Sequence, residues 1–233
     1  MKVRVALLAA AWLAAVLSSA SMARAATMMA DGTYQYTLNQ NGASTGTSAL
    51  TIKRSGSVIA IHEDETIADP SFGTVQASAD QTLAITTLSP LSFVAAYTSA
   101  GKTQDVRLAL GGMTGSFIHN GERLTVPVRL LPGTQAMAIQ DQALVMSFIV
   151  VPALAEVASA SAFTIAVPTA ARTFIMHVDP APPVKPANVQ ASDVGFAIAS
   201  PVAFAVWLDP KTGLVDEIDV PAQSLVISLT KHT

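Results

Sequence analysis

The stretch DGTYQYTLNQNG, residues 31–42, decides the fold class of this chain. Tyr34, Tyr36 and Leu38 alternate with polar residues, and this period of two is typical of a strand with one buried face. The dipeptide Asn41-Gly42 follows, and it readily takes the positive φ values of a tight hairpin turn. The stretch therefore predicts a strand that turns back on itself to begin an antiparallel sheet.

Similar strand-sized segments, separated by turn residues at intervals of about 8 to 12, continue along the chain. This spacing is typical of an all-β antiparallel sheet, barrel or sandwich. The further strands that we expect lie near residues 50–52, 58–62, 83–88, 93–97, 106–110, 113–119, 124–130, 163–167, 174–178, 194–198, 202–208, 218–220 and 225–229.

One segment, DQALVMSFIVVPALAEVAS at residues 141–159, breaks this pattern. It is apolar without a period of two, and its length fits a helix that starts at a capping Asp141. We expect Pro152 to kink or end this helix. The uncharged part, residues 143–155, has 13 residues, fewer than the roughly 20 that cross a bilayer. The segment therefore predicts a buried helix laid across the sheet.

The first 25 residues have the three parts of a secretory signal peptide. Lys2 and Arg4 precede an apolar run over residues 5–17, and Ala-Arg-Ala at 23–25 is a small-residue cleavage site. The apolar run is too short to span a bilayer, so we expect cleavage and no transmembrane span afterwards. The expected product is one β-rich domain over residues 26–233, exported to the periplasm or secreted.

Composition excludes several classes of function. The chain has no cysteine, which rules out disulfides, thiol nucleophiles and zinc–thiolate sites. Without the leader it carries 10 basic and 16 acidic side chains, and no basic run exceeds two residues, so no nucleic-acid partner is expected. Only 12% of the residues are charged while 51% are hydrophobic, which indicates a large core or an apolar groove.

The string DPKTG at residues 209–213 resembles the Asp-Lys-Thr-Gly phosphorylation signature of cation-pumping ATPases, with one proline inserted. That signature needs lysine directly after aspartate in an α/β domain, and neither condition holds here. Pro210 presets φ and Gly213 permits a positive φ, so the string predicts a hairpin turn between two strands.

The densest polar cluster is His62-Glu63-Asp64-Glu65. On a strand, His62 and Asp64 face one side while Glu63 and Glu65 face the other. No second ligand cluster accompanies it, so we expect a solvated strand end and no metal site. The competing hypothesis is a hydrolase that uses His62 or His177 with nearby carboxylates. The sequence has no Gly-x-Ser-x-Gly elbow or other catalytic motif, and it predicts no cofactor.

Two short motifs resemble those of uncharacterised exported proteins classed as domains of unknown function. They are the first strand Gly-x-Tyr-x-Tyr, here residues 32–36, and the closing hairpin Trp-x-Asp-Pro-x-Thr-Gly-Leu, here residues 207–214. Such proteins look distantly like the periplasmic lipoprotein carriers, whose curved sheet wraps a helix and holds acyl chains. The resemblance implies a single, strongly curved antiparallel sheet or open barrel, with residues 141–159 as its covering helix and no catalytic residue.

We therefore expect a mainly β, soluble, non-enzymatic protein that binds a hydrophobic or amphiphilic molecule such as a lipid, or that serves as an interaction module of the envelope. A structural subunit of an envelope assembly is a third hypothesis, and the sequence specifies no oligomeric state. Large aromatic side chains on the strands are expected to line the ligand groove, namely Tyr34, Tyr36, Phe93, Tyr97, Phe204 and Trp207.

Overall fold

The computed structural model describes residues 29–69, 73–112, 114–142, 144–158, 160–179, 184–186, 189–200 and 202–233. The signal peptide expected over residues 1–25 lies outside them. The strands are β1 (Gly32–Gln40), β2 (Ala43–Ser55), β3 (Val58–Asp69), β4 (Gly73–Ala84), β5 (Pro90–Ser99), β6 (Lys102–Gly111), β7 (Thr114–His119), β8 (Glu122–Arg129), β9 (Met137–Ile139), β10 (Ala162–Val167), β11 (Arg172–Asp179), β12 (Val194–Ser200), β13 (Phe204–Leu208), β14 (Val215–Val220) and β15 (Leu225–His232).

All these strands belong to one sheet, in which the first strand lies in the interior. β1 pairs with β2 on one side and with the last strand, β15, on the other. From that centre the strands follow the sequence from β1 outward to the edge strand β8, and they run in reverse sequence order from β15 outward to the edge strand β9. Every neighbouring pair is antiparallel except β9 and β10. The sheet thus consists of two meanders joined along β1 and β15.

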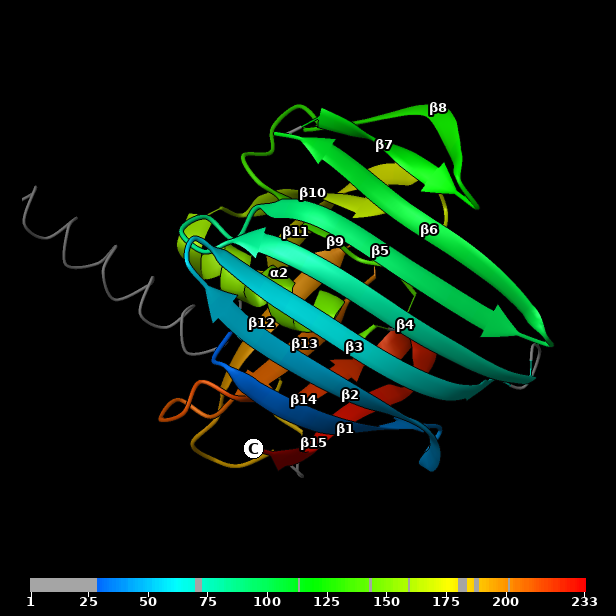
Figure 1. The fold of residues 1–233 in the computed structure, drawn as a ribbon. Helices are drawn as coiled ribbons and strands as arrows, with labels where there is room; N and C mark the ends of the chain where they lie inside the picture. Colours follow the sequence, from blue (N-terminus) through cyan, green and yellow to red (C-terminus); the bar gives the residue numbers. More distant parts are fainter. Residues whose placement is uncertain are drawn as a thin grey trace, which may run out of the picture.

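The sheet curves strongly around the helix α2 (Val145–Ala158) and does not close into a barrel. Strands β1 to β6 pass on one side of this helix and β9 to β13 on the other (Figure 1). Every residue from Val145 to Ala155 is buried, because sheet surrounds the helix on more than one side. The prediction of a mainly β, strongly curved antiparallel sheet with one covering helix is confirmed.

The details of the helix differ from the expectation. It begins at Val145, and Asp141 does not cap it, because its first N–H groups bond to the side chain of Glu63 on β3. Pro152 lies inside the helix, which continues to Ala158. A mid-helix proline costs about 3 kcal/mol, and the apolar packing around the helix offsets that cost here.

Strand β4 was not recognised in the sequence. It spans Gly73–Ala84, and the strand expected at residues 83–88 is wrong, because residues 85–87 form a turn. The consecutive inward positions Ala77, Ala79 and Gln81 are small or polar, so the middle of β4 lacks large apolar residues. The short strand β9 was also not expected.

The DPKTG string forms the predicted hairpin turn. The Asp209 carboxylate accepts the Lys211 N–H at 2.8 Å and the Thr212 hydroxyl at 2.8 Å. Gly213 has φ of +72°, and its N–H donates to the Asp209 carbonyl at 2.7 Å. These contacts give Asp209 a structural role in the turn.

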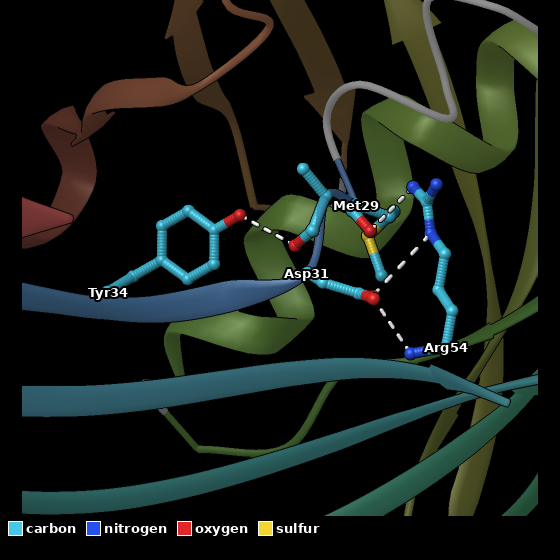
Figure 2. Close-up of polar contacts among 5 residues, drawn as sticks. Met29, Asp31, Tyr34 and Arg54 are labelled. Carbon is cyan, nitrogen blue, oxygen red and sulfur yellow. Dashed lines mark hydrogen bonds and ion pairs between the residues drawn. The ribbon is translucent and has the colours of Figure 1, made fainter. Parts of the chain in front are cut away.

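The segment that precedes β1 is fixed to the sheet by Arg54 and Tyr34 (Figure 2). The Arg54 guanidinium donates to the Met29 carbonyl at 2.7 Å, and its backbone N–H donates to the Asp31 carboxylate at 2.8 Å. The Tyr34 hydroxyl donates to the Ala30 carbonyl at 2.7 Å. The Met29 side chain is fully buried, so the segment before β1 is anchored in the packed core through this residue.

Within the described ranges, no helix combines the length and the apolar character needed to cross a membrane.

Candidate ligand-binding site

A cavity of about 220 Å³ lies at one end of the inner face of the sheet. Most of its wall is apolar and comes from β1, β3, β4 and β15, while its rim is polar. The exposed side chains of Gln142 and Gln223 place the rim at the solvent boundary. The wall consists of Leu38, Ile67, Val75, Ala77 and Leu225, the rim of Gln40, Thr45, Gln142 and Gln223, and Glu65 and Tyr97 complete the lining.

The strand register explains why a cavity forms here. Ser48 of β2, Glu65 of β3, Ala77 of β4 and Tyr97 of β5 are successive cross-strand partners, so they lie in one row on the inner face. Ala77 has a one-carbon side chain between two larger neighbours. The row is therefore indented at Ala77, and Glu65 borders the indentation.

The carboxyl group of Glu63 is fully buried and lies at the start of α2. It accepts hydrogen bonds from the Ser48 hydroxyl at 2.7 Å, the Val145 N–H at 2.8 Å and the Met146 N–H at 2.8 Å. Burial raises the pKa of Glu63, and these three donors oppose the rise. Because a helix N-terminus favours negative charge, Glu63 is the member of the Glu63–Glu65 pair better suited to be the carboxylate.

Glu65 lies two residues further along β3 on the same face, and its side chain hydrogen-bonds to Glu63. It is 4% exposed, and its Oε2 atom is buried without a hydrogen-bond partner. Burial and the neighbouring Glu63 charge raise the pKa of Glu65 well above its ordinary value. Two adjacent buried carboxyls favour holding one proton between them, so Glu65 is the protonated member. Glu65 is part of the cavity lining, and its Oε2 atom is a buried acceptor without a donor.

A third buried carboxyl, Asp141, binds the lining residue Tyr97. Its oxygens accept the Tyr97 hydroxyl at 2.8 Å, the Thr169 N–H at 3.0 Å and the Thr169 hydroxyl. Burial raises the pKa of Asp141, and the bonds from Thr169 and Tyr97 oppose the rise. Asp141 thus ties β5 and the β10–β11 turn to the segment that enters α2, and it occupies the polar end of Tyr97.

Of the six aromatic residues expected to line a groove, Tyr97 is the one that lines this cavity. Tyr36 packs in the core, with its hydroxyl bonded to the Val215 carbonyl at 3.2 Å. Phe204 meets Phe148 of α2 edge to face, with ring centroids 5.0 Å apart. Tyr34 and Phe93 are also buried in the core.

Trp207 lies on the opposite face of the sheet from the cavity. Its neighbour Val206 points into the main core, and adjacent strand residues face opposite sides. The indole N–H donates to Asp219 at 3.1 Å, and the Lys185 ammonium lies 5.7 Å from the ring centroid. That ammonium also donates to the Gln190, Ala191 and Asp193 carbonyls, so a surface loop covers the ring.

The outer face of β3 carries His62, whose ring nitrogens contact Asp80 at 2.9 Å and Asp64 at 3.2 Å. The prediction of a solvated strand end fits His62 and Asp64. It is wrong for Glu63 and Glu65, which are buried. The alternation of side chains correctly placed His62 and Asp64 on one face of β3 and the two glutamates on the other. It did not show which of the two faces would be buried. His177, on β11, is separated from β3 by six intervening strands in the sheet order. No group of three or more histidine or acidic side chains in the described part of the chain is arranged to hold a metal ion.

The described strands form an open, curved antiparallel sheet around a buried helix, and comparison with known proteins finds this fold elsewhere. No protein family model matches the chain, and no curated protein matches it. The crystal structure of a β-barrel-like protein of domain of unknown function DUF1849, from Brucella abortus, is similar, with 12% sequence identity and a TM-score of 0.50. The match covers 87% of this chain and 95% of that chain.

At this identity the likeness shows the fold alone. It supports the predicted resemblance to β-sheet domains of unknown function. The more distant likeness to lipoprotein carriers stays a prediction.

Proposed function

We propose that this protein is an exported, non-enzymatic binding protein whose inner-face cavity holds a small amphiphilic molecule. The proposal is supported by the mixed lining of the cavity, which combines an apolar wall with a polar rim and a single buried carboxyl. Ligand sites in proteins commonly combine an apolar wall with a few well-placed polar groups. An apolar chain would pack against Leu38, Ile67 and Leu225, and a polar end would bond to Glu65.

The observation that carries the proposal is the unpartnered Oε2 atom of Glu65. Buried polar atoms are almost always hydrogen-bonded, and leaving one unsatisfied costs about 1 to 3 kcal/mol. A ligand that donates a hydrogen bond to this atom recovers part of that cost. This gain in binding free energy adds to the gain from burying the apolar surface of the ligand against the cavity wall.

The size of the cavity limits the ligand. At about 220 Å³ it is smaller than the roughly 300 to 1,000 Å³ of pockets that enclose drug-sized molecules. It therefore suits one short chain or one end of a longer amphiphile, and a complete two-chain lipid would extend past the rim.

The test is calorimetric titration of the folded protein with 1-octanol, a neutral amphiphile with one chain and one hydroxyl. We expect saturable binding to wild type and loss of binding in Ala77→Leu, because the added carbons fill the indentation beside Glu65. Ala49→Leu, on the exposed face of β2, is the matched control and should bind like wild type. Binding that persists unchanged in Ala77→Leu would place the ligand elsewhere and overturn the proposal.

A further inference from the structure

We propose that the ligand of this cavity is an organic amine, bound as its ammonium ion by the free carboxyl oxygen of Glu65. This inference rests on the proposed function and specifies the polar end of the ligand. It starts from the chemistry of the cavity lining, in which Glu65 Oε2 is the buried polar atom without a partner.

The charge of the lining selects against acidic ligands. None of the described residues that line the cavity is a lysine, arginine or histidine. The buried titratable groups beside it are Glu63 on β3, Asp141 before α2 and the Tyr97 hydroxyl on β5. An incoming carboxylate or phosphate would meet acidic groups with no cation to offset them, so fatty acids and phospholipid headgroups are disfavoured.

The hydrogen bonds that the buried carboxyls already accept also favour a cationic ligand. Glu63 already accepts three protein donors, and Asp141 accepts the Tyr97 hydroxyl and two donors of Thr169. The oxygen of Glu65 is left without a donor, although it lies beside the buried charge of Glu63. An ammonium ion supplies both a hydrogen bond and a positive charge, and charge-assisted bonds are about twice as strong as neutral ones.

Binding of the ammonium ion is coupled to loss of a proton from Glu65. In the free protein, Glu65 and Glu63 hold one proton between them. When the ammonium enters, that proton leaves to solvent and the two carboxylates share the ligand cation and the donors at the start of α2. The rim groups from β1, β2 and the 3₁₀ turn Pro221–Gln223 are Gln40, Thr45 and Gln223, which do not titrate.

The experiment compares three probes that share one chain, namely n-octylamine, 1-octanol and sodium octanoate, by calorimetry at neutral pH. We expect octylammonium to bind about tenfold or more tightly than octanol and octanoate to bind weakest. Titrations in two buffers of different ionisation enthalpy should show proton release with octylammonium and none with octanol.

The diagnostic variant is Glu65→Gln, which has nearly the shape of the protonated carboxyl, likewise offers a carbonyl acceptor and a hydrogen-bond donor, and is expected to fold. It should keep wild-type affinity for octanol, lose about tenfold or more of its affinity for octylammonium, and release no proton. Glu122→Gln removes the same charge from an exposed edge strand and should behave like wild type, which tests for general attraction of cations to an acidic protein.

The outcomes separate the two proposals. If octanol or octanoate binds wild type as tightly as octylammonium, or if Glu65→Gln keeps the amine preference, the amine assignment is overturned while the binding function stands. If none of the three probes binds the folded wild-type protein, both proposals are wrong.

Discussion

The carboxylate of Glu63 accepts the backbone N–H of Val145, 82 residues further along the chain, at 2.8 Å. A side chain from a strand therefore caps α2, a role that usually belongs to the residue just before a helix. This contact joins the two parts of the fold, since it sets where α2 starts against the inner face of β3. It also leaves Glu65, the next inward residue of β3, beside a buried charge at the edge of the cavity.

Removal of this cap should destabilise the protein. In Glu63→Ala, the Val145 and Met146 N–H groups lose their partner in a buried site, and we expect a loss of roughly 3 kcal/mol in the free energy of unfolding. Urea denaturation followed by circular dichroism measures it. Glu122→Ala, an exposed change on β8, should stay within about 0.5 kcal/mol of wild type. An equally small effect at Glu63 would show that the contact is not required for stability.

The raised pKa of Glu65 makes stability depend on pH. Above the ordinary value of 4.5, the unfolded chain releases this proton while the folded protein keeps it, so rising pH favours unfolding until folded Glu65 also ionises. The contribution of one such proton is at most about 1.4 kcal/mol per pH unit. Glu65→Gln removes it, so the variant should become more stable than wild type as pH rises above 4.5 and should match it near pH 4.

Denaturation series from pH 4 to 8 on both proteins test this pH dependence. The other titratable groups that face Glu65 or the cavity are the same in both proteins, namely Glu63, Asp141 and Tyr97. Their contributions to the pH dependence of the free energy of unfolding largely cancel in the difference between the two proteins. A difference that stays constant with pH, or that falls as pH rises, would mean that Glu65 is already ionised in the folded protein.

Arg54 should stabilise the segment before β1, as Figure 2 indicates. Arg54→Ala removes the bond to the Met29 carbonyl, and we expect a loss of about 1 to 2 kcal/mol together with faster hydrogen exchange in residues 29–34. Lys53→Ala, at the exposed neighbouring position, is the control and should leave both quantities near wild type. Unchanged exchange in Arg54→Ala would show that burial of Met29 and the remaining hydrogen bonds hold the segment without the guanidinium.

Trp207 should report on the outer face of the sheet and not on the ligand. Because it is the one tryptophan in the described residues, its emission is a specific probe. We expect no shift when octylammonium saturates the cavity, and a shift to longer wavelength in Lys185→Ala, which loosens the loop over the ring. Lys211→Ala, at an exposed turn position, is the control. A shift on ligand binding would place the ligand near Trp207.

Local patterns were sufficient to predict much of the fold. The period of two in β1, the Asn41-Gly42 turn and the DPKTG hairpin depend on residues close together in sequence, and each formed as expected. The apolar 14-residue helix was also recognised from its composition. Strand β4 was not predicted, because the inward residues in its middle, Ala77, Ala79 and Gln81, are small or polar and carry no local signal of burial.

Most of the candidate site could not be predicted from the sequence. Tyr97 was predicted as a lining residue, whereas Glu65 was expected at a solvated strand end. Alternation alone assigns Glu63 and Glu65 to one face of β3 and His62 and Asp64 to the other, and it treats the two faces alike. Trp207 shows the same limit, because its burial beneath the Lys185 loop on the outer face depends on residues far from the strand.

By itself, then, the sequence determined most of the strands, the hairpin turns and the helix α2, because these follow from side-chain periodicity and from the backbone preferences of a few neighbouring residues. The tertiary structure alone decided which face became the interior and where the helix began. Those outcomes depend on how the sheet curves, since curvature brings β3 against residues 82 positions away and buries a carboxyl pair that would otherwise be hydrated.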